Sequence, residues 1–288
     1  MADTAPAPLP AAAELIGQYS LEMTGKDLPA LDAAADLIPA CTKINITFLG
    51  NEDLDMRVAA AAGVRERGFV PVPHISARRL GSQRELETFL DRLQQVDATS
   101  HLFCVGGDPA TPQGPYADAL SVIRTGLLAR YGTTEVSIAG YPEGHPDIAT
   151  DVLWEHLEAK AAALSEQELD AVVLTQFAFD VDPVIAWIDQ VRARGIRSQL
   201  RIGIPGPAGV ARLLGFARRF GIGANTNIVK KYGFSLTHLV GTAGPDRFVG
   251  DLATRLGDRP DAGDVRLHLY TFGGLRASAE WAREAGRA

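Results

Sequence analysis

The sequence predicts an α/β protein, a closed (β/α)8 TIM barrel. Eight short apolar or β-branched runs alternate with stretches of helical periodicity along the 288 residues, at a spacing of roughly 25 to 35 residues that is typical of βα units. Most runs are continuously apolar, as expected for parallel strands covered on both faces. Eight such units in a chain of this length favour a closed barrel. An open doubly wound sheet would usually show a Gly-x-Gly-x-x-Gly turn after its first strand, where this chain has Glu22-Met23-Thr24-Gly25.

Local patterns place the elements of the N-terminal half. Alternating β-branched residues over 42–48 predict a strand. Two prolines within 69–74 predict that this strand is short. Ser82, followed three residues later by Glu85, predicts the capped start of an amphipathic helix. The expected strands are 18–23, 42–48, 69–74 and 101–105, and the expected helices are 28–37, 53–67, 82–95 and 116–131.

The C-terminal half continues the alternation, with one less regular stretch over 221–263. Pro207 lies just inside an expected helix start, where its missing N–H costs nothing. The expected strands are 135–139, 171–177, 199–204 and 266–272, and the expected helices are 149–164, 181–194, 206–220, about 245–256 and 275–286. Residues 1–14 are rich in Ala and Pro and lack the pattern of a signal peptide. We therefore expect a disordered tail over 1–14 and a single barrel domain over 15–288.

Composition and charge narrow the classes of partner. The formal net charge is −7, the two signs are interspersed and no long basic tract appears, so neither nucleic acid nor a membrane surface is expected as a partner. No apolar stretch is long enough to span a bilayer, and we expect a cytoplasmic protein. Cys41 and Cys104 lie in or beside apolar runs and are expected to be buried free thiols. No Cys/His spacing resembles a zinc site, so no metal is expected.

Polar residues follow the strands at the ends where α/β barrels bind ligands. The clearest case is the loop over 140–147 (GYPEGHPD), between an apolar strand and a helix. Each such residue also has a structural interpretation: Asp108 can stabilise a Gly-Gly-Asp turn, and a histidine can bind backbone carbonyls. The set lacks a Gly-x-Ser-x-Gly nucleophile and a phosphate-binding Gly-x-x-x-x-Gly-Lys loop, and it suits an uncharged heteroaromatic ligand or an organic cofactor. Its members are Glu22, Thr47 with Asn51, His74, Asp108, Tyr141, Glu143, His145, Gln176 and Tyr270.

Several stretches together resemble methylenetetrahydrofolate reductase, the MetF-type flavoprotein family. They are residues 107–108 (GD), 139–146 (AGYPEGHP), 175–180 (TQFAFD), 203–208 (GIPGPA) and 269–271 (LYT), and they occur in the family order. The family is a TIM barrel, which agrees with the strand count. Barrels of this family commonly associate into homo-oligomers.

The resemblance implies a reaction and a set of site residues. NADH or NADPH would reduce bound FAD, and the flavin would pass hydride to 5,10-methylenetetrahydrofolate, giving 5-methyltetrahydrofolate. Glu22 matches the family's general acid, Asp108 the acidic residue near flavin and pterin, and Gln176 a folate ligand, with Tyr270 also on the substrate side. The matching FAD positions are Thr47, His74, Val105, Gly106, Gly107, Asp108, Tyr116, Ala117, Ala139, Tyr141, His145, Lys160 and Tyr270.

The chain departs from the family pattern mainly on the cofactor side. Gly106 stands where an Arg often precedes Gly-Asp, Ala159 replaces a second basic residue beside Lys160, and Gly273 replaces the usual Asn. Met23-Thr24-Gly25-Lys26 replaces an aromatic-Pro-Pro run. Three alternatives therefore stay open: direct hydride transfer from NAD(P)H without flavin, a metal-assisted hydrolase or lyase using Asp108, His74 and His145, and a non-catalytic folate-binding barrel.

Overall fold

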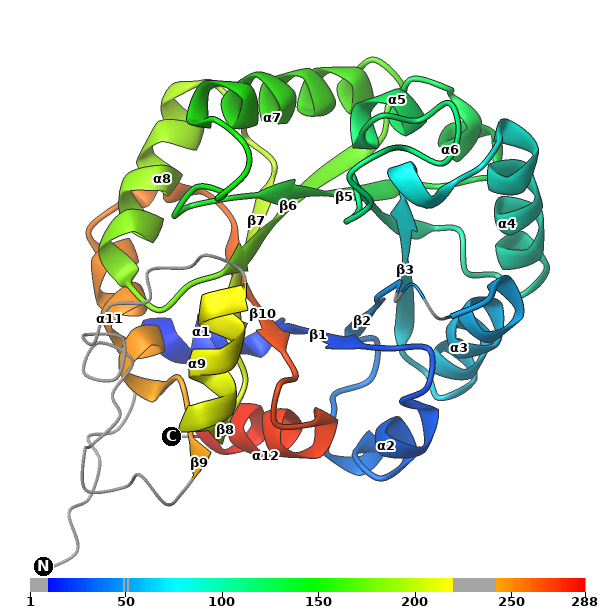
Figure 1. Cartoon of the computed structure of the whole chain (residues 1–288). Helices are drawn as coiled ribbons and strands as arrows, with labels where there is room; N and C mark the ends of the chain where they lie inside the picture. The colour runs from blue at the N-terminus through cyan, green and yellow to red at the C-terminus, as the bar shows by residue number, and fades with distance from the viewer. Residues whose placement is uncertain (1–9, 49, 51, 220–241, 288) are drawn as a thin grey trace, which may run out of the picture.

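Eight parallel strands form a closed barrel in the computed structural model, which describes residues 10–48, 50, 52–219 and 242–287 (Figure 1). Around the barrel the strand order is β1-β10-β7-β6-β5-β4-β3-β2. Each of the eight expected strands overlaps one of these, so the predicted TIM barrel is confirmed. The strands are β1 Ser20–Met23, β2 Lys43–Ile46, β3 Val70–Ser76, β4 His101–Val105, β5 Glu135–Gly140, β6 Asp170–Phe177, β7 Gln199–Pro205 and β10 Val265–Tyr270.

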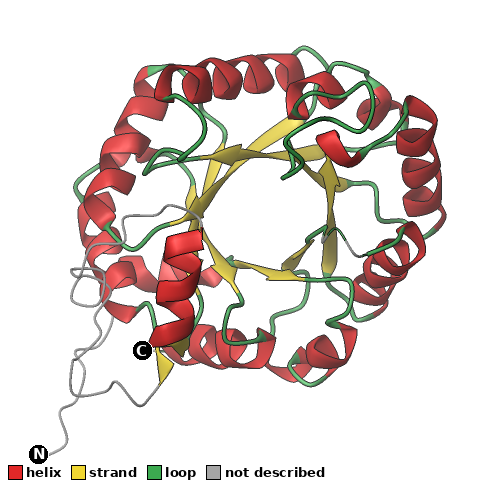
Figure 2. Ribbon diagram, in the orientation of Figure 1, coloured by secondary structure: helices red, strands yellow, loops and turns green. Residues whose placement is uncertain are grey.

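Helices surround the barrel (Figure 2). The α4 helix shows why: Leu86, Phe89, Leu90 and Leu93 recur at helical spacing and are all buried. Its N-cap is Ser82, as predicted, although the Glu85 carboxylate accepts from Gly81 N at 2.8 Å. No helix of the described ranges is both long and apolar enough to cross a membrane. The helices are α1 Pro10–Gly17, α2 Leu28–Asp32, α3 Leu54–Glu66, α4 Gln83–Gln95, α5 Ala119–Ile123, α6 Leu127–Arg130, α7 Thr150–Ser165, α8 Val181–Ala193, α9 Val210–Arg219, α11 Asp246–Gly257 and α12 Leu275–Ala285, with 3-10 turns η1 Ala35–Leu37, η2 Ala77–Arg79 and η4 Pro260–Ala262.

The expectation of a short third strand was wrong. β3 runs for seven residues in spite of Pro71 and Pro73. Val70 donates its N–H to Thr42 O on the β2 side at 3.0 Å, and successive residues of a strand face opposite neighbours. The two proline nitrogens therefore face β4, where pairing begins only at His74.

Several helix expectations also needed correction. The helix expected over 116–131 is interrupted at Gly126, whose φ of +70° is left-handed, and gives α5 and α6. The helix expected over 206–220 begins only at Val210, because β8 (Ala208–Gly209) pairs with β9 (Thr242–Ala243); residue 220 lies outside the described residues. The helix expected over 28–37 divides into α2 and η1.

The structure also corrects the expected tail and the expected burial of one cysteine. α1 includes residues 10–14, where the sequence predicts a disordered tail; residues 1–9 lie outside the described residues. α1 packs against α11 and β10. Cys104 is buried as predicted, but Cys41 is exposed, because it lies in the turn that precedes β2.

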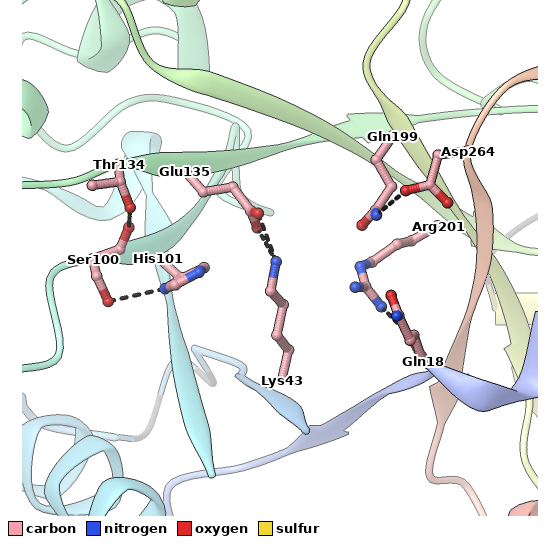
Figure 3. A network of polar contacts seen from close by, with 9 residues as sticks. All are labelled: Gln18, Lys43, Ser100, His101, Thr134, Glu135, Gln199, Arg201 and Asp264. Carbon is pink, nitrogen blue, oxygen red and sulfur yellow. Dashed lines mark hydrogen bonds and ion pairs between the residues drawn. The ribbon is translucent and has the colours of Figure 1, made fainter. Parts of the chain in front are cut away.

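The barrel interior has an apolar middle layer and a charged end. Val72, Phe103 and Leu174 are buried together inside the barrel, with Val105, Ala139 and Tyr270 packed against them. Polar residues gather at the N-terminal ends of the strands, here called the barrel floor (Figure 3). There Lys43 Nζ donates to both oxygens of Glu135, at 2.7 and 2.6 Å. The ligand-binding end must therefore lie above the middle layer, at the carboxyl ends of the strands.

Candidate functional site

Glu22 lies at the carboxyl end of β1, beside the neighbouring end of β10. Its side chain is 20% exposed, and one carboxylate oxygen is 3.8 Å from His268 Nε2. Thr271 Oγ1 donates to the Glu22 carbonyl oxygen at 2.7 Å, which fixes the backbone here. Burial raises the pKa of Tyr270 well above its usual value, and the neighbouring charges of Glu22 and Tyr141 raise it further. One acid and two phenols therefore share the barrel mouth.

Gln176 sits at an irregularity of β6. The register against β7 shifts between Leu174 and Phe177, and such bulges re-aim side chains next to active sites. The Gln176 Oε1 atom accepts from Phe177 N at 3.1 Å. The Gln176 residue is half-buried.

Tyr270 is held by β6 and β7. Its hydroxyl donates to Thr175 O at 3.0 Å, and Thr175 Oγ1 accepts from Gly203 N at 2.8 Å. A Cβ atom at Gly203 would stand 2.7 Å from the Tyr270 ring, so only glycine allows the ring to lie against this backbone.

Aromatic rings form one wall of the mouth. The Phe177 ring packs edge-on against Tyr270 at 5.4 Å, Phe272 at 5.1 Å and Phe179 at 5.7 Å. Tyr270 and Phe272 are stacked at 5.8 Å. Phe177 and Phe179 are buried in the core, whereas Tyr270 and Phe272 are half-buried, so these two rings are the ones that a planar ligand could reach. Sequence reasoning missed Phe177 and Phe272, although each lies within two residues of a predicted site residue.

The 140–147 loop folds back on itself. The Tyr141 and His145 rings meet edge-on at 5.3 Å, and His145 Nδ1 accepts from Asp147 N at 3.1 Å. Burial raises the pKa of Tyr141. A Cβ atom at Gly140 would stand 2.8 Å from the Trp187 ring, so glycine lets α8 approach the end of β5. The cavity of about 510 Å³ behind the loop, between α7 and α8, is not lined by Glu22 or Tyr270.

Several buried polar atoms have no hydrogen-bond partner within the part of the chain that the structure describes. Burial, together with the nearby His268 and Arg57, lowers the pKa of His74 to about 3. The His74 ring packs edge-on against Phe103 at 4.6 Å. Since buried polar atoms are normally paired, unpartnered ones are contacts available to a ligand. Over the described residues these include Asn45 Oδ1, Thr47 Oγ1, His74 Nε2, Tyr116 OH and His268 Nε2.

Asp108 does not point at Glu22 but outward to Arg79. The Arg79 Nε and Nη2 atoms donate to the two carboxylate oxygens at 2.9 and 2.8 Å, and the Asp108 side chain is 76% exposed. The turn before it is pinned by Arg78, whose N–H donates to Gly106 O at 2.8 Å. Sequence reasoning also missed Arg79. Its only sequence signal was a basic pair just after a strand.

Lys160, Tyr116 and Ala117 form a separate group around the start of α5. Lys160 is buried on α7, and burial lowers its pKa to about 8, with Cys104 and Asp118 as opposing neighbours. Tyr116 is buried, and the exposed Ala117 accepts from Arg78 Nε at 2.8 Å. The predicted residues therefore divide between the mouth and a flank beside β4, as an elongated ligand would require.

The metal-dependent alternative has no ligand set among the described residues. Within residues 10–48, 50, 52–219 and 242–287, no three His, Cys, Asp or Glu side chains could hold a metal ion together. Asp108 is bound by Arg79, and His145 by its own loop. Asn51, predicted beside Thr47, lies outside the described residues.

Comparison with known proteins identifies the family. A family model described as methylenetetrahydrofolate reductase matches residues 43–224, more than half of the chain. The chain belongs to the methylenetetrahydrofolate reductase family. The match includes Thr47, His74, Asp108, Tyr141 and Gln176, whereas β1 and β10 lie outside it. Glu22 on β1 and Tyr270 on β10 therefore lie outside the matched residues.

Individual curated relatives that the chain matches carry the same family name. Methylenetetrahydrofolate reductase 2 of Saccharomyces cerevisiae is 29% identical over 189 residues, covering 60% of this chain and 29% of that protein. The 5,10-methylenetetrahydrofolate reductase of Salmonella typhimurium is 26% identical over 167 residues, covering 56% and 53%. This chain thus spans about half, or less, of the relatives it matches.

A solved structure shows the same fold. An uncharacterised Clostridium thermocellum protein that binds two copies of 5-methyl-5,6,7,8-tetrahydrofolic acid superposes with a TM-score of 0.57, over 95% of this chain and 98% of that one. At 9% identity the likeness concerns the barrel alone.

Proposed function

We propose that this protein reduces 5,10-methylenetetrahydrofolate to 5-methyltetrahydrofolate with NADH or NADPH as the reductant. The observation that carries the proposal is the partly exposed Glu22 carboxyl group at a barrel mouth walled by aromatic rings, in a chain of this family.

Glu22 is assigned the proton step. Reduction requires the five-membered ring of the substrate to open to an iminium ion, and a proton on the leaving nitrogen makes that opening easy. The side chain stands at the mouth with one fifth of its surface exposed, so it can donate to a ligand and recover a proton from solvent. Hydride then reaches the iminium carbon, which becomes the methyl group.

Gln176, Tyr270 and Asp108 are assigned to the folate. The Gln176 amide nitrogen offers hydrogen bonds to the pterin, and the Tyr270 ring stacks in the aromatic wall. A carboxylate near the pterin would favour a cationic iminium. Because Arg79 binds Asp108 in this structure, the charge that Asp108 offers a ligand is balanced until the pair opens.

The residues present fit FAD. Thr47 Oγ1, His74 Nε2 and Tyr116 OH are buried and unpartnered over the described residues, and they would bind its polar edges. Lys160, a buried cation, would hold the phosphates, with Val105, Gly106, Gly107, Ala117, Ala139, Tyr141 and His145 supplying the surrounding surface. When bound, FAD would carry the hydride from the nicotinamide to the folate.

Direct hydride transfer from NADH or NADPH is the second candidate. Gly106 and Ala159 carry no charge at two positions where the family often has basic residues, and Arg79 is already paired with Asp108. These features weaken the phosphate side of an FAD site and leave the Glu22 side unchanged.

The absorption spectrum of the purified protein separates the two candidates. Paired near-ultraviolet and blue bands would support bound FAD. A colourless protein that reduces 5,10-methylenetetrahydrofolate without added FAD would support direct transfer. A protein that binds folate but shows no turnover, with or without added FAD, would overturn both candidates and support a non-catalytic binding barrel. Activity that is lost on EDTA treatment would support a metal-dependent enzyme instead.

Replacing Glu22 tests the acid assignment. Glu22→Gln should lower folate reduction by about 10²- to 10⁴-fold while binding of 5-methyltetrahydrofolate persists. Glu143→Gln is the matched control, because Glu143 is an exposed carboxylate of the mouth loop to which we assign no ligand contact. Unchanged turnover in Glu22→Gln would show that another group supplies the proton.

A further inference from the structure

An arginine is buried at the barrel floor, at the opposite end of the barrel from Glu22. Arg201 lies on β7, in register with Arg266 on β10, and it is only 5% exposed. Its Nη1 atom donates to the backbone oxygen of Gln18, just before β1, at 3.0 Å (Figure 3). Nothing in the proposed reaction uses this side chain.

One edge of the Arg201 guanidinium group has no partner within the part of the chain that the structure describes. Its Nε atom is buried and unpaired there, and its Nη2 atom forms no hydrogen bond in the same ranges. The N–H groups of these two atoms point in the same direction and form a fork that fits two oxygens side by side. Arg79 uses the same edge to bind both oxygens of Asp108. Since buried polar atoms are normally paired, the Arg201 edge marks a binding position.

The neighbouring carboxylates are already bound to other cations. Glu135 accepts from Lys43 through both of its oxygens. Asp264 Oδ1 pairs with Arg266 Nε at 2.8 Å. Burial lowers the pKa of Arg201, and the charges of Glu135 and Asp264 oppose that shift without cancelling it. Three cations therefore meet two carboxylates at the floor, and a buried charge is costly unless it is paired.

The other polar groups around the floor do not supply the missing charge. Burial lowers the pKa of His101, so its ring is neutral at physiological pH. Asp170 is exposed, and the Glu14 side chain is 78% exposed, so water screens both carboxylates. Gln199 lies two residues before Arg201 on the same face of β7, and its buried Oε1 atom has no donor among the described residues.

We propose that the barrel floor binds a small monovalent oxyanion with a planar O–C–O group, either bicarbonate or a short carboxylate, on the Nε/Nη2 edge of Arg201. The fork favours two coplanar oxygens over a halide, and the single excess positive charge favours a monovalent ion over a dianion. The Lys43 and Glu135 side chains are 20% and 17% exposed, so solvent reaches the floor. The ion would strengthen the closure between β7 and β1, and its binding does not depend on the reductase reaction.

Thermal unfolding measures the effect of the ion. Acetate or bicarbonate at ten times its Kd should raise the melting temperature by about 2 °C above that in chloride of equal ionic strength and pH. Arg201→Lys keeps the charge but not the fork, and the loss of one charge-assisted hydrogen bond should weaken acetate binding about tenfold. Arg276→Lys is the matched control, because Arg276 is an exposed arginine of α12 that pairs with Glu280.

Nuclear magnetic resonance tests the contact directly. In protein labelled with ¹⁵N-arginine, the Nε–H signal that is lost in Arg201→Lys should shift when acetate or bicarbonate is added and stay in place with chloride. If Arg201→Lys does not fold, a wild-type Nε–H signal that moves with acetate but not with chloride still supports the site.

A third variant distinguishes the two sources of the ion. Bicarbonate carries a hydroxyl that can donate to Gln199 Oε1, whereas an ionised carboxylate carries none. Gln199→Met should therefore weaken bicarbonate binding several-fold and leave acetate binding unchanged if the site is built for bicarbonate. Equal affinities of the wild type and Gln199→Met for both ions would assign the site to a short carboxylate.

Three results would each overturn the proposal. The first is equal stabilisation by chloride, which would reduce the effect to ionic strength. The second is an Arg201 Nε–H signal that neither acetate nor bicarbonate moves. The third is unchanged acetate affinity in Arg201→Lys, which would show that the fork does not bind the ion.

Discussion

Removing one partner of the Lys43–Glu135 pair should destabilise the barrel, and removing both should destabilise it much less. The two residues begin β2 and β5, which are not neighbours in the sheet, so the pair connects opposite walls across the barrel floor (Figure 3). Their side chains are 20% and 17% exposed. Glu135→Leu leaves the ammonium group without its carboxylate, and Lys43→Met leaves the carboxylate without its cation.

The size of the effect follows from this burial. Breaking a fully buried pair costs about 3–5 kcal/mol, and the residual exposure reduces this to about 2–4 kcal/mol per single substitution. For 288 residues the unfolding entropy is about 0.6 kcal/mol/K, from ~2.1 cal/mol/K per residue. Each single variant should therefore melt about 3–7 °C below the wild type. The double variant should lose only about 1 kcal/mol, because apolar pairs replace buried ion pairs at little cost.

Urea and thermal unfolding of the four proteins measure the cycle. Burial lowers the pKa of Lys43, while the charge and hydrogen bond of Glu135 oppose that shift. In Glu135→Leu the unfolded chain therefore binds more protons than the folded one, and the stability deficit should shrink as pH rises from 7 to 9. Single losses below about 1 kcal/mol, or a double variant that loses the sum of both, would refute the reasoning.

Two further predictions concern the upper barrel. Because burial holds the pKa of His74 at about 3, below its unfolded value of about 6.5, the unfolded chain binds the extra proton as pH falls. Wild type should then lose about 2 kcal/mol more stability than His74→Gln between pH 7 and 5, measured by urea unfolding; equal losses would contradict burial of a neutral ring. Gly140→Ala places a methyl group 2.8 Å from Trp187 and should cost about 1–3 kcal/mol. An unchanged melting temperature would mean that α8 can shift to make room for the added methyl group.

Local sequence patterns were enough to predict the strands and the positions of several candidate site residues. Each strand core is a run of a few apolar or β-branched residues, and counting these runs placed Glu22, Gln176 and Tyr270 at strand ends. The errors arose where tertiary context overrides a local rule. Two prolines fit inside β3 because their nitrogens face an unpaired stretch of the neighbouring strand. The helix break at Gly126 reflects a left-handed φ that the sequence only permits.

The sequence by itself determined the barrel class, the family resemblance and which strand ends carry acids, amides and aromatics, because each depends on residues close together in the chain. The tertiary structure alone decided which of these side chains meet. Asp108 is bound by Arg79 rather than placed beside Glu22, Lys43 reaches Glu135 across the floor, and His268 reaches Ser20 where β10 closes against β1. Such contacts depend on strand register and barrel closure, which bring distant residues together and leave no local pattern to read.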